Sequence, residues 1–221
     1  MSRDIQNSKE LLIVSDTGMY QLDDEIKAFG PVVNEVKYFS EEFDSITWLG
    51  YTRMDQINNK SYLTVNQKKV TIIMLPRIGG KILKSKIQII LQYPKMFLLI
   101  LKLLRTKKYI HVRAPSHPAL ITMLLSCFFP RNQFWFKYAG SWVDKASPFY
   151  EFQRGVLKKL GKNCKITVNG KWKNKKENIL AFENPCLNNE DRINGKSIVD
   201  EKVFESKMNF CFVGALNKAK G

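Results

Sequence analysis

The stretch KKYIHVRAPSHPALITMLL, residues 107–125, decides the fold. Its first half is a short run of β-branched and aromatic residues that ends at a proline, which predicts a strand over 109–115. Its second half opens an apolar run in which Ser116 stands at the position of a helix cap and Pro118 falls in the first turn, so it predicts a helix. A strand that leads directly into a helix is the repeating unit of α/β folds.

The same alternation continues on both sides of this stretch. Short apolar runs predict further strands over 11–15, 45–51, 69–76, 134–142, 165–170 and 178–185. Apolar residues at helical spacing predict helices over 25–43, with an interruption at Gly30-Pro31, and over 84–107 and 148–162. This order of elements predicts an α/β fold with a Rossmann-like, doubly wound parallel sheet.

The candidate binding residues follow the predicted strands, because ligands of doubly wound sheets bind at the carboxyl ends of the strands, against helix N-termini. Arg113 would meet an anion or hydroxyl groups there, and His117, in a first helical turn, could exchange a proton. At 138–142, Trp142 offers a stacking face, although a tight strand-to-helix turn explains the same residues. His111 is expected to be a core residue of its strand. The candidates are Gly18, Arg113, His117, Tyr138, Ser141 and Trp142.

Several common chemistries have no support in the sequence. There is no phosphate loop, no G-x-G-x-x-G after the first strand and no G-x-S-x-G. The chain has two histidines and four widely spaced cysteines, so we expect no metal site and no disulfide framework, as in a reducing compartment. The N-terminus does not resemble a signal peptide, and the longest apolar run, MFLLILKLL, is too short to span a bilayer. A cytoplasmic protein is expected.

Charge is distributed very unevenly along the chain, whose net charge is +16. Residues 1–60 carry 6 basic and 11 acidic side chains, whereas residues 61–221 carry 30 basic and 9 acidic ones. No acidic residue occurs between Gln56 and Val143. Such a field attracts a polyanion or an anionic surface, although a solvated basic surface is the simpler alternative.

Two segments bear on the choice of anionic partner. Residues 154–176 carry nine basic side chains, no acidic one and Trp172, which would suit a nucleic-acid backbone. Their aromatic residues are not interleaved as stacking platforms, however, and the order of elements is not that of a nucleic-acid module. Together with the apolar and basic helix over 84–107, they favour the anionic inner face of the plasma membrane over nucleic acid.

KKYIHVRAPSHPALITMLL, FWFKYAGSW (134–142) and NFCFVGALNKAKG (209–221) together resemble the N-terminal half of GT-B glycosyltransferases of family 4. In that family the corresponding strand ends in His-x-His or His-x-Arg, here His111 and Arg113. The resemblance implies two Rossmann-like domains, of which the first binds the acceptor and the second the nucleotide-sugar donor. It implies that Arg113 and His117 orient the acceptor, with Gly18, Tyr138, Ser141 and Trp142 around it. No cofactor is expected besides the nucleotide sugar as co-substrate.

The end of the chain is similar to the strand and glycine turn that open the donor domain. The family motif reads Phe-Val-Gly-Arg-Leu and closes on Lys-Gly. Here Lys220 matches the lysine that grips the diphosphate, Ala215 replaces the arginine, and Lys218 could substitute for it in part. The resemblance implies an acceptor domain over 1–185, a connection over 186–207 and the start of a truncated donor domain over 208–221.

The expected function is therefore transfer of a sugar from a nucleotide sugar to a surface-glycan or lipid-linked acceptor, with this chain inactive by itself. The alternative is a basic α/β module without catalytic activity that binds an anionic membrane or nucleic acid. The two differ in their response to salt, since binding to nucleic acid weakens steeply as salt rises.

Overall fold

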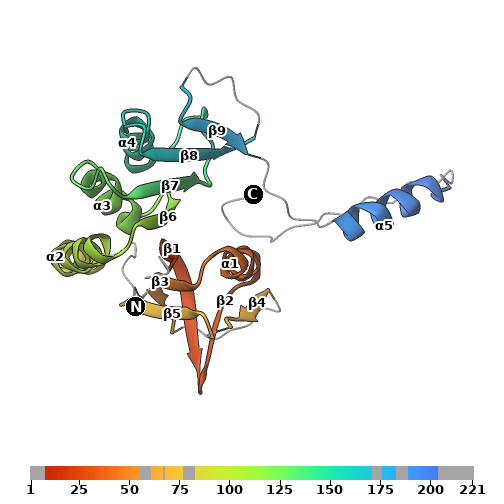
Figure 1. Cartoon of the computed structure of the whole chain (residues 1–221), viewed down its shortest axis with the longest axis horizontal. Helices are drawn as coiled ribbons and strands as arrows, with labels where there is room; N and C mark the ends of the chain where they lie inside the picture. The colour runs from red at the N-terminus through yellow and green to blue at the C-terminus, as the bar shows by residue number, and fades with distance from the viewer. Residues whose placement is uncertain are drawn as a thin grey trace, which may run out of the picture. The chain divides into compact units, whose positions relative to one another are not determined.

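The computed structural model describes residues 8–54, 61–66, 68–76, 83–170, 176–182 and 189–203. The chain forms two compact units, residues 1–184 and 185–221. The described residues of the first unit form the sheet and four helices; their arrangement is drawn in Figure 1. In the second unit the described structure is the helix α5 (Asn189–Asp200), within the polar segment that the sequence predicts as a connection.

Seven strands of the first unit run parallel, in the order β5–β3–β1–β6–β7–β8–β9. They are β1 (Glu10–Leu22), β3 (Ser45–Thr52), β5 (Val70–Leu75), β6 (Tyr109–Ala114), β7 (Gln133–Tyr138), β8 (Cys164–Asn169) and β9 (Ile179–Phe182). The first strand lies inside the sheet and the order reverses beside it. This confirms the α/β class and the mostly parallel sheet, which is compatible with a Rossmann-like fold.

Helices cover the sheet on both faces (Figure 1). The helices α2 (Leu83–Thr106), α3 (His117–Ser126) and α4 (Pro148–Leu157) pack on one face, and α1 (Gly30–Glu42) packs on the other. The strand β1 supplies both cores because its side chains alternate: Leu12 and Val14 face α2 and α3, while Leu11 and Ile13 face α1. All four of these side chains are buried.

The sequence prediction of a helix over 25–43 is wrong in its first part. Residues Glu25–Phe29 form the strand β2, which pairs antiparallel with the end of β1 across a turn at Asp23. The reason is a period of two: Ile26 and Ala28 are buried while their neighbours are more exposed. The helix begins only at Gly30, with a proline in its first turn.

This hairpin makes the sheet mixed. The short strand β4 (Tyr62–Thr64) extends it by pairing antiparallel with β2. The strand β1 therefore runs well beyond the predicted 11–15, with a shift in its pairing to β3 between Val14 and Gly18. The chain irregularity at this shift lies where the carboxyl ends of the parallel strands meet.

Candidate functional site

A pocket of about 270 Å³ lies at the carboxyl ends of β3 and β6 and beside the irregular middle of β1. Residues just before α3, and residues in the first turns of α3 and α4, complete it. Its lining consists of Asp16, Gly18, Tyr51, Arg53, Pro115, Ser116, His117, Phe149 and Tyr150. The pocket therefore forms at the edge where the sequence predicts binding, and it includes Gly18 and His117 from the predicted set.

The first turn of α3 places His117 in this pocket. The Ser116 hydroxyl oxygen accepts a hydrogen bond from the backbone N–H of Ala119 at 3.2 Å, which caps the helix as expected. The backbone N–H of Ser116 in turn donates to Gln153 Oε1 at 3.1 Å, so α4 holds the same turn. These bonds fix the backbone from which the imidazole projects.

Tyr93 of α2 holds the His117 ring. Its hydroxyl oxygen lies 2.7 Å from His117 Nδ1, and the Phe149 ring lies beside the imidazole with centroids 4.7 Å apart. Burial lowers the pKa of His117 below its ordinary value, because desolvation disfavours the charged form. The half-buried imidazole is therefore neutral near pH 7 and can take part in proton transfer.

Asp16 is an exposed residue on another side of the pocket. Desolvation by the surrounding protein raises the pKa of its carboxyl, although a backbone hydrogen bond and Arg113 act in the opposite direction. Burial and the charge of Asp16 raise the pKa of the neighbouring Tyr51 as well, so its phenol stays protonated. The pocket thus gathers a carboxyl group, an imidazole and a phenol within one small space.

At Gly18 the wall of the pocket has no room for a side chain. A Cβ atom at this position would lie 2.6 Å from Cγ of Arg53. The stem of Arg53 therefore packs directly on the Gly18 backbone, and its guanidinium lies 5.8 Å from the centre of the Tyr20 ring. The sequence prediction gave this glycine close approach to a ligand, whereas the structure gives it close approach to Arg53.

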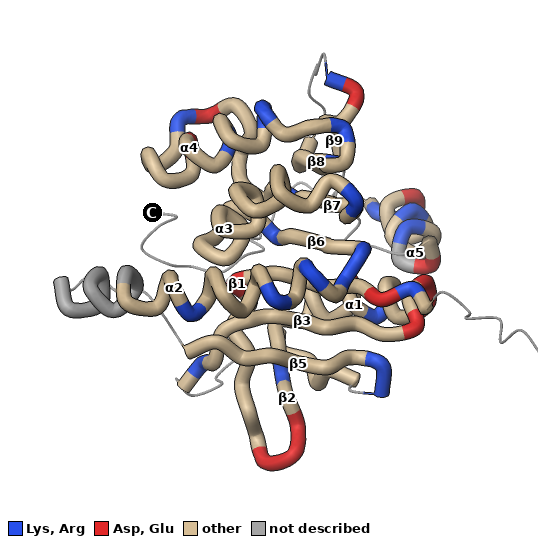
Figure 2. The backbone as a smooth tube through the Cα atoms, turned by 60° about the vertical axis from the view of Figure 1, so that its left-hand side comes forward, with Lys and Arg blue, Asp and Glu red and all other residues tan. Residues whose placement is uncertain are grey.

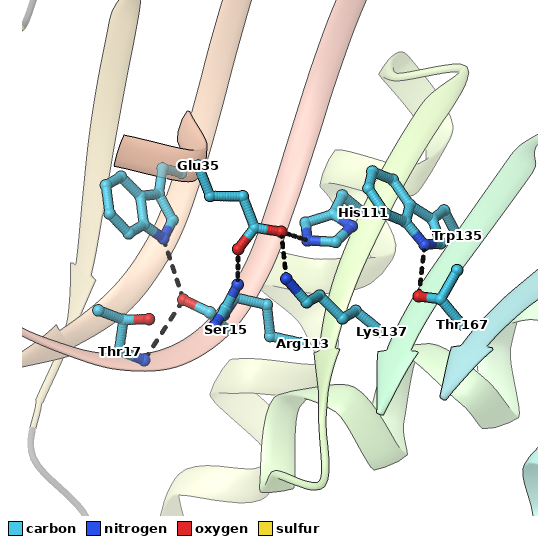
Figure 3. A network of polar contacts seen from close by, with 9 residues as sticks. Ser15, Thr17, Glu35, His111, Arg113, Trp135, Lys137 and Thr167 are labelled. Carbon is cyan, nitrogen blue, oxygen red and sulfur yellow. Dashed lines mark hydrogen bonds and ion pairs between the residues drawn. The ribbon is translucent and has the colours of Figure 1, made fainter. Parts of the chain in front are cut away.

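Arg113 lies on the α1 face of the sheet rather than in the pocket lining. It forms an ion pair with Glu35 of α1, and Lys137 Nζ donates to Glu35 Oε1 at 2.9 Å (Figure 3). Desolvation by itself would raise the pKa of Glu35, but Arg113, His111 and Lys137 together hold it below its ordinary value. The guanidinium that the sequence assigns to a ligand is thus engaged by a carboxylate 78 residues away.

His111 is in the core, as expected, but its ring is not satisfied by hydrogen bonds. The side chain is 1% exposed, and among the described residues neither ring nitrogen has a hydrogen-bond partner. Its Nε2 lies 3.7 Å from Glu35 Oε1, too far for such a bond. Burial lowers the pKa of His111 to about 3, so the ring is neutral.

The side chains in and around the turn after β7 contact one another. Tyr138 and Trp142 are buried, with their rings in edge contact at 5.4 Å. The Ser141 hydroxyl donates to Asp144, and Arg154 donates to the carbonyl oxygens of Ser141 and Asp144. None of these side chains lines the pocket, which corresponds to the tight-turn alternative. Lys218 and Lys220 lie outside the described residues.

A larger pocket, of about 560 Å³, lies against α1 at the amino ends of β6 and β7. Aromatic side chains such as Phe39 and Trp135 form its walls, and Arg131, Lys162 and Lys165 surround it. The nitrogens of its one histidine, His111, are covered. We therefore place the candidate site in the smaller pocket, where titratable groups meet at the carboxyl edge.

Sequence reasoning missed Tyr93, Tyr51 and Arg53. Tyr93 is the polar exception on the packed side of α2, and this is a signal that could have pointed to a partner. In the described part of the chain, no three acidic, histidine or cysteine side chains are grouped as metal ligands would be. Nor is any helix in that part long and apolar enough to cross a membrane.

Comparisons with protein-family models, with curated proteins and with solved structures give no match to this chain.

Proposed function

We propose that this chain is the acceptor-binding half of a GT-B glycosyltransferase, which transfers a sugar from a nucleotide sugar to a glycan or lipid-linked acceptor. The observation that carries the proposal is the pair of His117 and Tyr93, 2.7 Å apart in a pocket at the carboxyl edge of the sheet. The resemblance of residues 107–125, 134–142 and 209–221 to that family supports the same assignment.

The pocket has the groups that recognition of a sugar hydroxyl requires. In the transfer, the acceptor oxygen bonds to the anomeric carbon, the bond from that carbon to the donor phosphate breaks, and the hydroxyl proton passes to a base. A His117 ring that donates from Nδ1 to Tyr93 keeps Nε2 free to accept that proton. Phe149 and Tyr150 offer apolar ring faces to the sugar, and Asp16 can accept hydrogen bonds from its other hydroxyl groups.

The departing nucleotide diphosphate needs cations in a closed site. In this proposal Lys220, with Lys218, supplies part of that charge, and the remainder comes from a donor domain. Arg113 then acts through Glu35 on the sheet rather than on the acceptor. The chain by itself should bind acceptor sugars without turning over a nucleotide sugar.

The test is a titration of the purified chain with methyl glycosides of common hexoses and 2-acetamido sugars, and with a sugar linked to farnesyl diphosphate. The two histidines of the chain provide the readout by NMR. We expect the ring signals of His117 to shift and those of His111 to remain in place. His117→Asn should weaken binding about tenfold, and Tyr93→Phe about three- to fivefold, because each removes a hydrogen bond.

Lys162→Gln, at the larger pocket, is the control and should bind as the wild type does. Three results would contradict the proposal: turnover of a nucleotide sugar by the chain alone, sugar binding that His117→Asn leaves unchanged, or no binding of any probe. Binding of DNA or RNA that falls steeply with salt would favour the alternative of a basic module instead.

A further inference from the structure

The outer side of α2 carries an exposed apolar and basic stripe. Leu91, Lys95, Leu98 and Lys102 follow one another at spacings of four, three and four residues, which places them on one face of the helix. Leu91 is 68% exposed and Leu98 is 63% exposed. Exposed apolar side chains that line up on one face of a helix form a candidate interaction surface.

The opposite side of the same helix is fully engaged in the core. Met96, Ile100 and Leu104 are buried against the sheet, and Tyr93 reaches His117. The stripe therefore cannot turn inward without the loss of this packing. We call the stripe and its exposed neighbour Arg105 the α2 surface.

The charged side chains of the α2 surface itself have one sign. The sequence holds no acidic residue between Gln56 and Val143, a range that includes the whole of α2 and α3. Figure 2 shows basic residues along the described part of α2 and no acidic one. Apolar side chains interleaved with lysines, without carboxylates, complement a surface that combines hydrocarbon and negative charge.

We propose that the α2 surface docks on a lipid membrane that contains anionic lipids. Leu91 and Leu98 enter the boundary between headgroups and acyl chains, and Lys95 and Lys102 contact lipid phosphates. The helix lies in the plane of the membrane surface, as amphipathic helices of peripheral proteins do. This inference does not depend on sugar binding, because no residue of the α2 surface lines the pocket of His117.

A bilayer fits this surface better than nucleic acid does. Nucleic acid would use the lysines but gains little from Leu91 and Leu98, since single strands stack on aromatic rings and duplexes present phosphates. A bilayer uses both kinds of side chain. Since the same helix carries the stripe on one side and Tyr93 on the other, docking leaves the contact between Tyr93 and His117 in place.

The experiment is flotation of the purified chain with phosphatidylcholine vesicles, with and without phosphatidylglycerol. We expect binding only when phosphatidylglycerol is present, and weaker binding at high salt. The double variant Leu91→Ser, Leu98→Ser should lose about tenfold or more in affinity, because it removes two membrane-buried side chains. Lys102→Gln should lose about fivefold.

Each variant has a matched control on another exposed part of the first unit. Leu180→Ser, on β9, removes an exposed leucine, and Lys37→Gln, on α1, removes an exposed lysine; both should bind as the wild type does. Far-UV circular dichroism checks that every variant is folded. Equal binding by the double variant and Leu180→Ser would overturn the proposal, as would no binding to anionic vesicles.

A third result would also overturn it. If duplex DNA bound the chain and Lys102→Gln weakened that binding while the leucine variant did not, the α2 surface would be a nucleic-acid site. The sugar titration is a separate measurement on the pocket residues. Failure of membrane binding and failure of the glycosyltransferase proposal can therefore be told apart.

Discussion

His111 and Glu35 form an unusual pair at the scale of single residues. The imidazole lies against the rings of Phe39 and Trp135, with centroids 5.1 and 4.2 Å away. Its third neighbour is the Glu35 carboxylate, which also interacts with Arg113 and Lys137. Protonation of His111 would place a further positive charge beside Arg113 and Lys137. Both burial and these neighbours therefore keep the ring neutral, although Glu35 opposes them.

This neutral state predicts sensitivity to mild acid. The pKa of His111 is lowered from 6.5 to about 3, so below pH 6.5 the unfolded chain binds a proton that the folded chain does not. The free energy of unfolding should then fall by about 1.4 kcal/mol per pH unit below that point. Urea titrations at pH 7.5, 6 and 5 measure the fall. The lowered pKa of Glu35 adds a loss only near and below 4.5, outside this window.

The variant His111→Phe separates the pH dependence that the His111 ring causes from that of the other titratable groups. It keeps a flat side chain and removes the titrating nitrogens, so most of the dependence between pH 6.5 and 5 should disappear. His117→Gln is the comparison, because its pKa is also lowered but the ring is half-buried. An unchanged slope in His111→Phe would show that the ring is protonated in the folded chain.

The ion pairs of Glu35 predict a second effect at the scale of residues. Glu35→Gln leaves Arg113 and Lys137 without their carboxylate in a mostly buried place, so we expect a loss of about 3 kcal/mol in unfolding free energy. Glu10→Gln is the matched control. Its carboxylate pairs with Lys107 at 2.8 Å on a more open surface, where a pair contributes about 0–1 kcal/mol.

Urea denaturation at pH 7.5 distinguishes the two variants. If Glu35→Gln cost no more than Glu10→Gln, the cluster of Figure 3 would have the strength of an ordinary surface pair. The structural role of Arg113 would then lose its support, and a ligand-binding role would regain it.

At the scale of elements, β3 passes very close to the irregular part of β1. A Cβ atom on Gly50 would lie 2.8 Å from the carbonyl oxygen of Thr17 and 2.6 Å from Cε of Met19. Ser15 also links β1 to β3 here, since its hydroxyl donates to the Leu49 carbonyl and accepts from Trp48 Nε1–H, both at 3.0 Å. This contact between strands shapes the floor next to the pocket.

Gly50→Ala and Gly155→Ala should therefore change stability in opposite directions. Gly50→Ala forces the β1 backbone to move, and we expect a loss of about 1–3 kcal/mol. Gly155 lies in α4, and a Cβ atom there meets nothing within 4 Å, so alanine should add about 0.5–1 kcal/mol through helix propensity. Urea midpoints of the two variants test this, and a neutral Gly50→Ala would contradict the close approach.

The elements that sequence reasoning could find are those with a clear period and a clear stop. The parallel strands β6 and β7 are rich in β-branched and aromatic residues, and Ser116 with Pro118 marks the start of α3, so their order predicted the sheet. The hairpin of β1 and β2 escaped because five alternating residues, Glu25–Phe29, directly precede a helix and merge into its pattern. Pairing across the chain, not local propensity, decides such a segment.

At the scale of the whole molecule, topology predicted where the site lies but not how its side chains are used. The order of elements predicted a site at the carboxyl edge of the sheet, and Gly18 and His117 do line the pocket there. The direction of Arg113 did not follow, because neighbouring strand residues point to opposite faces and its partner Glu35 comes from α1. Tyr93 likewise reaches His117 from another element, and a single sequence does not record that contact.

The division into two units predicts that residues 1–184 fold alone. All the parallel strands that the structure describes, and the helices that cover them, belong to this unit, and every described side chain of α5 is exposed. A chain that ends at Asn184 should therefore keep its unfolding free energy to within about 0.5 kcal/mol. A chain that ends at Gly170 is the comparison. It lacks β9, where Ile179 is buried, and Asn178, whose amide donates to the carbonyl oxygens of Leu160 and Cys164.

Urea denaturation followed by circular dichroism compares the three chains. We expect the chain of 1–184 to match the full chain and the chain of 1–170 to unfold at a clearly lower urea concentration, because it exposes Ile166 and Val168 of β8. Equal losses in both shortened chains would mean that residues after Asn184 contribute to the stability of the sheet. The first unit would then not be the independent folding unit on which the binding pocket is built.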